Sequence, residues 1–304
     1  MSKKQPTNTA ASVRQRLLNK ARADKRTFNE LLQYFAMDRF LYRLSHSIHA
    51  DKFVLKGALM LRAWKSPIFR PTMDIDMLAQ RTSNEVAEME KLIRSICETK
   101  VDSDGLEFDS TSVQGVRIVE DADYEGVRIL FSGKLDTARI RMQVDIGFGD
   151  VIYPGPQNTE MPVILDFPPA VLNAYSLESS IAEKFEAMIK LDSLNSRMKD
   201  FYDIWLLSRQ FDFRSHELQR AIELTLQNRN TELPEIITAF TDNFIQGKST
   251  QWNAFRRKIN TDNIPIDFYE VVNQIKQFLT PALEGVQTGM KMNLQWKAPG
   301  PWKG

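Results

Sequence analysis

The sequence predicts an α+β lobe followed by a helical lobe. Between residues 106 and 148, short alternating or β-branched runs are separated by clusters of Asp, Gly and Lys, which is the pattern of strands and turns. Beyond Tyr175 the apolar residues recur at helical spacing. The chain has 304 residues, of which 42% are hydrophobic, so it is long enough to form about two domains, each with its own core.

The expected elements follow in chain order. Apolar spacing predicts an amphipathic helix over residues 27–49, a shorter helix over 54–64, a strand over 73–78 and a helix over 84–99. Strands are then expected in the runs VQGVRIVE, GVRILFSG and ARIRMQVDIGF, with a further candidate in PVILDF. The helical lobe is expected to hold helices over residues 177–192, 198–210, 216–228, 233–246, 250–259 and 267–279.

These patterns divide the chain into four expected segments. They are a basic N-terminal arm (1–26), an α+β lobe (27–170), a helical lobe (171–284) and a C-terminal tail rich in Gly, Pro and Lys (285–304). The arm carries eight Lys and Arg residues against Asp24 alone. Such an arm attracts phosphate backbones, which favours a nucleic-acid partner. A solvated helix face or a disordered tail would also explain it.

Composition excludes several classes of protein. No apolar run approaches the roughly 20 residues that span a bilayer, and the N-terminus lacks a signal peptide's apolar segment, so we expect a cytoplasmic protein without a membrane partner. Cys97 is the only cysteine, which rules out an internal disulfide and a cysteine-built zinc site. With only three histidines besides, a bound metal would be held mainly by carboxylates, which suits magnesium.

Three aspartates are the candidate metal ligands. Asp74 and Asp76 are two apart in a predicted strand, so their side chains point the same way, and a divalent cation would relieve their mutual repulsion. An exposed edge strand or turn would also account for this pair. Asp145 lies in a later strand beside apolar neighbours and therefore needs a partner. Two-metal phosphoryl transfer would supply one, and a salt bridge with Arg139 or Arg141 is the alternative.

The residues before the aspartate pair suit a bound triphosphate. Gly57 and Ala58 open a predicted helix, where backbone N–H groups and the positive end of the helix dipole favour phosphate. Arg70 and Thr72 complete the pattern R-x-T-x-D-x-D and would add a cationic and a hydroxyl contact. A surface salt bridge is the alternative role for Arg70. Together with Lys56, these residues are the candidate nucleotide-binding group.

This order of motifs resembles the polymerase-β-like nucleotidyltransferases, which have a small-residue helix start, an Asp-x-Asp strand and a later single Asp. Two further segments resemble the AbiEii/AbiGii abortive-infection toxins of type IV toxin–antitoxin systems. YSLESSIAEKFEAMI (175–189) is similar to that family's Ser/Thr-x-Glu…Lys helix and aligns its lysine with Lys184. RMKDFYDIWLL (197–207) is similar to its Lys/Arg-Asp-x-x-Asp motif and aligns Lys199, Asp200 and Asp203. The resemblance covers roughly residues 28–210.

The resemblance implies a mixed polymerase-β-like sheet with flanking helices, followed by a helical C-terminal lobe. It also implies catalytic roles for Asp74, Asp76, Asp145, Lys184, Asp200 and Asp203. Physically, Lys184 would act as a flexible point charge for triphosphate oxygens, with one of the two later aspartates orienting it. An exposed Lys184 paired with Glu183 or Asp192, and helix capping or ion pairing by Asp200 and Asp203, are the alternatives. The chain departs from the family's Gly-Gly or Gly-Ser at Gly57-Ala58, which puts only fine nucleotide positioning in doubt.

The implied function is a Mg²⁺-dependent nucleotidyltransferase toxin that uses two ions. It would transfer a nucleoside monophosphate from a nucleoside triphosphate to the 3′ end of tRNA, block aminoacylation and growth, and be paired with a cognate antitoxin. One alternative keeps the chemistry and makes a small molecule or a protein the acceptor. The other is a non-catalytic module that binds RNA or an antitoxin.

Overall fold

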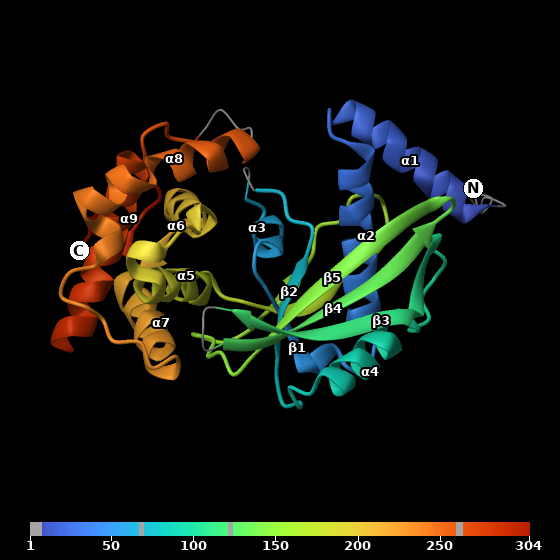
Figure 1. The fold of residues 1–304 in the computed structure, drawn as a ribbon, viewed down its shortest axis with the longest axis horizontal. Coiled ribbons are helices and arrows are strands. Elements are labelled where there is room, and N and C mark those ends of the chain that lie inside the picture. Colours follow the sequence, from blue (N-terminus) through green and yellow to red (C-terminus); the bar gives the residue numbers. More distant parts are fainter. Residues whose placement is uncertain (1–7, 67–69, 121–123, 260–263) are drawn as a thin grey trace. The chain divides into compact units, whose positions relative to one another are not determined.

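A computed structural model of the chain describes residues 8–66, 70–120, 124–259 and 264–304. The chain divides into two compact units (Figure 1). Unit 1 comprises Met1–Gly149 and Gln157–Ala174, and unit 2 comprises Asp150–Pro156 and Tyr175–Gly304. A mixed sheet with flanking helices and a helical C-terminal part confirm the predicted fold class. None of the described helices has the length and apolarity needed to cross a membrane.

Unit 1 is built on a seven-stranded mixed sheet in the order β3-β4-β5-β2-β1-β7-β6. β2 runs parallel to β5 and β1 runs parallel to β7, while the other neighbours are antiparallel. The strands are β1 (Phe53–Lys56), β2 (Ile75–Ala79), β3 (Leu106–Glu120), β4 (Tyr124–Leu135), β5 (Ala138–Phe148), β6 (Gln157–Glu160) and β7 (Val171–Ala174). The parallel pairing of β2 with β5 joins the strands that carry the candidate metal ligands.

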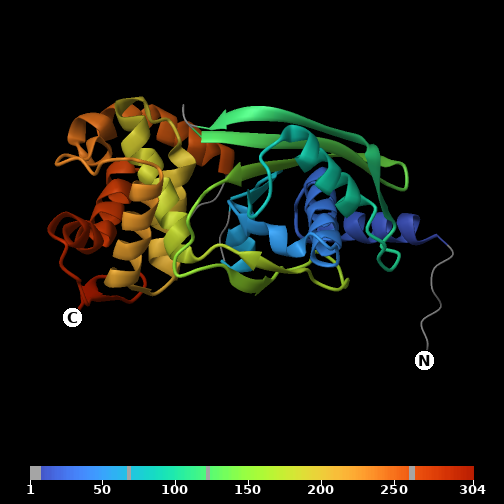
Figure 2. The same cartoon turned by 90° about the horizontal axis from the view of Figure 1, so that it is seen from below.

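Helices cover one side of strands β3 to β5 and leave the other side open (Figure 2). α2 packs on β5, whereas α4 packs on β3 and β4. Along β5 the residues Ile140, Met142, Val144 and Ile146 enter the core with these helices. Because side chains alternate along a strand, the intervening residues of β5 lie on the open side. The helices of unit 1 are α1 (Thr9–Ala23), α2 (Phe28–Ser45), η1 (Ala50–Lys52), α3 (Leu59–Ala63) and α4 (Val86–Cys97).

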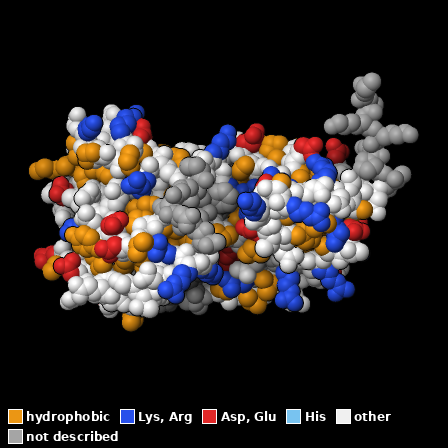
Figure 3. All heavy atoms as spheres, turned by 90° about the horizontal axis from the view of Figure 1, so that it is seen from above, with side chains coloured by type: hydrophobic (Ala, Val, Ile, Leu, Met, Phe, Trp, Pro, Cys, Tyr) orange, Lys and Arg blue, Asp and Glu red, His pale blue; other side chains and the backbone are white. Residues whose placement is uncertain are grey.

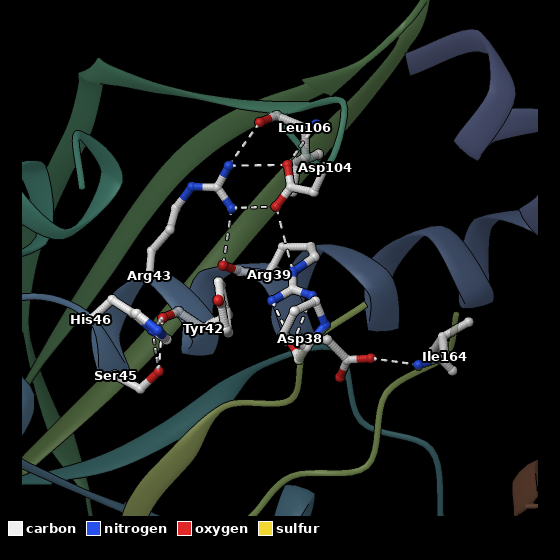
Figure 4. Close-up of polar contacts among 10 residues, drawn as sticks. Asp38, Arg39, Tyr42, Arg43, Ser45, His46, Asp104, Leu106 and Ile164 are labelled. Atoms are coloured by element: carbon white, nitrogen blue, oxygen red, sulfur yellow. Dashed lines mark hydrogen bonds and ion pairs between the residues drawn. The ribbon is translucent and has the colours of Figure 1, made fainter. Parts of the chain in front are cut away.

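A buried ionic network holds α2 against two loops (Figure 4). The Arg43 guanidinium donates to both carboxylate oxygens of Asp104, at 2.8 and 3.1 Å. The Nε atom of Arg39 lies 3.4 Å from the same carboxylate, and all three side chains are buried. On the same helix, the Asp38 carboxylate accepts one hydrogen bond from Arg62 at 3.0 Å and another from the Ile164 backbone N–H at 3.0 Å. The network thus fastens the central helix to the segment before β3 and to the segment around Ile164.

Several predicted elements of unit 1 differ from the structure. The expected helix over 54–64 is strand β1 followed by α3, because Gly57 turns the chain with a left-handed φ of 72°. PVILDF forms no strand. Its Ile164 N–H bonds to the Asp38 carboxylate rather than to a neighbouring strand, and Ile164, Leu165 and Phe167 pack on the core as an irregular segment. β6 and β7 form on either side of it instead.

Unit 2 is helical, with a small three-stranded sheet in the order β10-β9-β8. The two helices expected over 233–246 and 250–259 are one helix, α8, which is preceded by an irregular segment and the short η3. Its elements are α5 (Leu177–Leu191), η2 (Asp192–Leu194), α6 (Met198–Gln210), β8 (Phe213–Arg214), α7 (Ser215–Asn228), η3 (Thr238–Phe240), α8 (Asp242–Ile259), α9 (Phe268–Thr288), β9 (Gln295–Trp296) and β10 (Trp302–Lys303).

Both terminal segments are more ordered than their composition suggests. In the segment expected to be a C-terminal tail, Trp296 is buried and its indole N–H donates to the Ser208 carbonyl. In the N-terminal segment, residues 1–7 lie outside the described residues, and the rest forms α1 with Val13, Leu17 and Ala21 buried. Its cations are partly neutralised through the pairs Arg16–Asp166, Lys20–Asp24 and Arg26–Glu30. On the face drawn in Figure 3, Lys and Arg side chains likewise lie among Asp and Glu side chains.

Candidate active site

Three carboxylates converge on the open side of the sheet in unit 1. The parallel register of β2 and β5 places Asp76 directly beside Asp145. Asp74 comes immediately before β2, two residues from Asp76. One carboxylate oxygen from each of the three residues lies within 4.8 Å of the others. The structure therefore brings together the three aspartates that the sequence singles out.

Asp145 is oriented by two neighbours on the same side of the sheet. Arg128 on β4 donates to both of its carboxylate oxygens, with both N–O distances 2.8 Å. The Gln143 amide adds contacts of 3.0 and 3.2 Å. The ion-pair alternatives considered for Asp145, Arg139 and Arg141, are wrong. Both are exposed, and Arg128 is the partner because β4 and β5 pair Arg128 directly with Asp145.

The donor set fits a hard divalent cation. Three carboxylates supply oxygen ligands of the kind that magnesium prefers, in a cluster small enough for one ion to contact all three. The Thr72 hydroxyl donates to Asp74, and Arg128 and Gln143 fix Asp145. Outer hydrogen bonds of this type orient carboxylates for metal binding. Asp74, Asp76 and Asp145 would therefore hold the ion.

Lys56, the last residue of β1, and Gly57, which follows it, both lie beside Asp76. Lys56 pairs with Asp76 across the antiparallel β1–β2 ladder. A Cβ atom added at Gly57 would collide with the Asp76 carboxylate, so only glycine leaves room for that side chain. A small pocket opens at this point in unit 1. It is lined by Lys56, Asp76, Met77, Ile118, Gly126, Asp145, Ile146 and Gly147.

The remaining nucleotide-binding candidates are placed differently. Ala58 is buried, so only its backbone can approach a ligand, and the helix that it precedes, α3, has only five residues. Thr72 is also buried. Its N–H donates to the Tyr34 hydroxyl and its own hydroxyl donates to Asp74, so it orients a candidate metal ligand rather than offering an open phosphate contact. Arg70 is half-buried in the segment before β2.

Unit 2 contains a second cluster of charged side chains, between α5 and α6. The Lys184 ammonium lies 2.9 Å from Asp203 and 3.4 Å from Asp200, and both carboxylates are buried. Arg197 also contacts Asp200, at 2.7 Å. Lys184 is thus half-buried and paired with these two aspartates, whereas the alternative considered for it was an exposed lysine paired with Glu183 or Asp192. Lys199 of the same motif is exposed and lies apart from this cluster's ion pairs.

Replacing Gly57 with Ala is expected to displace the Asp76 carboxylate and to reduce the nucleotidyl transfer that the family resemblance implies on the order of 100-fold, because a shift of about 1 Å at a reacting centre has that effect. The measurement is the initial rate of nucleotide transfer. Gly289→Ala is the matched control, since Gly289 has a similar left-handed φ of 70° with no atom within 4 Å of an added Cβ. Equal activity in both variants would show that the close approach to Asp76 is unimportant.

The Glu178 carboxyl, in the first turn of α5, is expected to make the stability of the folded protein depend on pH. Burial raises the pKa of its carboxyl, and the nearby Glu217 carboxylate adds to the effect. A raised folded-state pKa means that the folded protein holds this proton more tightly, so this contribution is present below the unfolded pKa and is lost as the pH rises through the folded pKa. Glu178→Gln is therefore expected to raise the melting temperature at pH 8, with the gain shrinking towards pH 4. Melting curves of both proteins across that range test this, and a gain independent of pH would contradict it.

Comparison with known proteins gives a family and several solved structures. The model of the family described as nucleotidyl transferase AbiEii toxin, type IV TA system, matches residues 39–274. MenT4, a nucleotidyltransferase toxin from Mycobacterium tuberculosis H37Rv, shares 14% identity with a TM-score of 0.51, over 91% of this chain and 98% of that one. This likeness supports the fold.

Two structures from Helicobacter pylori have lower TM-scores. A putative nucleotidyltransferase shares 12% identity with a TM-score of 0.47, over 86% of this chain and 98% of that one. JHP933 shares 10% identity with a TM-score of 0.44, over 85% and 94%. The search of curated proteins gave no match.

Proposed function

The chain belongs to the AbiEii family of nucleotidyltransferase toxins of type IV toxin–antitoxin systems, and from this premise we propose that it is a magnesium-dependent enzyme that modifies RNA. It transfers a nucleoside monophosphate from a nucleoside triphosphate to the 3′-terminal hydroxyl of tRNA and releases pyrophosphate. The modified tRNA cannot be aminoacylated, so translation and growth stop. A cognate antitoxin is the partner that such a toxin requires.

The observation that carries this proposal is the convergence of Asp74, Asp76 and Asp145 within 4.8 Å. Three acids crowded together repel one another unless a cation lies among them. When bound there, magnesium supplies charge neutralisation for the phosphates and a lowered pKa for the attacking hydroxyl. Arg128 and Gln143 keep the Asp145 carboxylate in place, and Thr72 does the same for Asp74.

Other residues of the chain have proposed roles in holding the triphosphate. Lys56 borders the pocket beside Asp76 and Asp145, where its ammonium can contact phosphate oxygens. Gly57 and Ala58 offer backbone N–H groups, and Arg70 offers a guanidinium. For Lys184, a role in binding the nucleotide is proposed from the family motif alone. The pairing of its ammonium with the buried Asp200 and Asp203 restricts where that ammonium can lie.

The proposal is tested by incubating the protein with total tRNA, Mg²⁺ and each of the four labelled nucleoside triphosphates in turn. We expect label to enter tRNA from at least one triphosphate, and sequencing of the RNA ends identifies the added base. Periodate-oxidised tRNA, which lacks the 3′-terminal diol, is the control and should accept no label. Label on protein or a small molecule, with none on RNA, would replace tRNA as the acceptor.

A further inference from the structure

Three cations lie on the open side of strands β4 and β5, on the same side as the metal-binding carboxylates. Arg139 and Arg141 precede Asp145 by six and four residues along β5, so all three side chains point the same way. Lys134 on β4 pairs directly with Arg139. The uninterrupted pairing of β4 with β5 keeps this alternation intact as far as Asp145. We call Lys134, Arg139 and Arg141 the basic strand face.

Within the part of the chain that the structure describes, these three cations have no ion-pair partner. All three side chains are exposed, and none forms an ion pair with any residue in the described part of the chain. The cations of α1 differ, since Arg16, Lys20 and Arg26 each contact a carboxylate. When exposed guanidinium and ammonium groups neutralise the phosphates of a nucleic acid, the counterions condensed on that nucleic acid are released with a gain in entropy. The basic strand face is therefore available to an anionic ligand.

The position of these cations is suited to the acceptor rather than to the nucleotide. A strand rises about 3.3 Å per residue, so the Cα atoms of Arg141 and Arg139 are roughly 13 and 20 Å from that of Asp145. If a triphosphate binds at the carboxylates, its charged phosphates lie there, and only its uncharged base and ribose can extend further along the sheet. An anion that reaches both places must carry phosphates at regular intervals over this distance.

The surroundings of the basic strand face restrict the path of such a ligand. On the far side of β4, the β3 residues Glu107 and Asp109 pair with Lys134 and Ser132 and form an acidic border. Nearer the carboxylates, Leu130 on β4 and Val116 on β3, which pairs with Arg128, are 44% and 50% exposed. A polyanion is thus directed along β5, with apolar surface beside it that can contact ribose or base.

We propose that the basic strand face binds the phosphate backbone of the RNA acceptor and directs its 3′ end to Asp74, Asp76 and Asp145. This inference rests on the proposed function for the identity of the acceptor. Binding along β5 uses contacts to phosphate, which are independent of base sequence. The surface therefore confers affinity and orientation for RNA, while base selection is left to the site around the carboxylates.

The test compares the triple variant Lys134→Ala, Arg139→Ala, Arg141→Ala with the wild-type chain. Affinity for labelled total tRNA is measured without nucleoside triphosphate at several salt concentrations. We expect affinity to fall on the order of tenfold or more, and the slope of log K against log salt to become shallower by about 2 to 3, since each phosphate contact contributes about 0.7 to 0.9. The control variant Lys91→Ala, Lys100→Ala, Lys291→Ala removes the same charge from exposed positions outside both the basic strand face and the N-terminal arm, and should change neither quantity much.

The outcomes separate this inference from the proposed function. If the triple variant binds tRNA with the wild-type affinity and salt slope, or if the control variant loses as much, the inference is overturned. The same holds if the wild-type chain binds no tRNA. If the triple variant alone loses tRNA binding, the inference stands. It stands even when no triphosphate labels RNA, a result that would refute only the proposed transfer reaction.

Discussion

Asp76→Asn is expected to reduce nucleotidyl transfer by about 10³-fold while the protein remains folded. Charge stabilisation by a bound metal is worth several kcal/mol in the transition state, and about 4 kcal/mol corresponds to that factor. Asp76 is paired with Asp145 in the strand register, and its carboxylate lies within the cluster that would hold the ion. Removing one of three neighbouring negative charges also lessens the mutual repulsion of the carboxylates.

Two measurements on Asp76→Asn distinguish a lost ligand from a damaged fold. Single-turnover transfer rates give the loss of activity, and titration with Mn²⁺ followed by electron paramagnetic resonance reports metal binding independently of catalysis. Asp51→Asn, at an exposed position just before β1, is the control and should match the wild-type chain in both. Retention of manganese affinity and rate by Asp76→Asn would remove the carboxylate cluster from the mechanism.

Asp104→Ala is expected to lower the free energy of unfolding of unit 1 by about 3–5 kcal/mol, the usual cost of removing one partner from a buried ion pair. The side chains of Arg39 and Arg43 are 1% and 8% exposed, so their guanidinium groups would remain in the interior without this carboxylate. Arg43 would keep its hydrogen bonds to two backbone carbonyls, but these cannot replace the negative charge of the lost carboxylate.

Hydrogen exchange at the amides of α2 reports this change within unit 1, since α2 carries both arginines. Asp102→Ala removes an exposed carboxylate two residues away and should alter stability by no more than about 0.5 kcal/mol. Equal protection of α2 in the two variants would mean that the Asp104 contacts contribute little beyond what water provides.

The sequence predicted the parts of the site that depend on local spacing. Asp74 and Asp76 could be placed on one side of a strand because they are two residues apart, and Asp145 because its apolar neighbours alternate with polar ones. The contact of Arg128 with Asp145 could not be predicted, since it depends on the register between β4 and β5, which no pattern within either strand specifies. Lys184, Asp200 and Asp203 stood out through family resemblance, and their mutual ion pairs emerge only in three dimensions.

Prediction of the fold was limited where packing overrides periodicity. Trp296 lies in a segment rich in Gly, Pro and Lys, yet its large apolar ring is buried and its N–H is satisfied, so one side chain orders a segment without a period. PVILDF has the apolar content of a strand but borders Pro168 and Pro169, and its residues pack on the core without joining the ladder. The amino-acid composition of such a segment can be read from the sequence, but the contacts that order it are made with residues far away along the chain.

The side-by-side placement of Asp76 and Asp145 depends on two adjacent strands and not on the chain that connects them. Residues 80–137 leave β2 and return to β5, and this excursion can gain or lose residues in its turns without disturbing the pair. Within either strand, by contrast, the insertion of one residue would reverse the direction of every side chain beyond it. Divergent descendants of this chain should therefore show indels in the excursion and almost none inside β2 or β5. A search that fixes the interval between the two acidic motifs would overlook them.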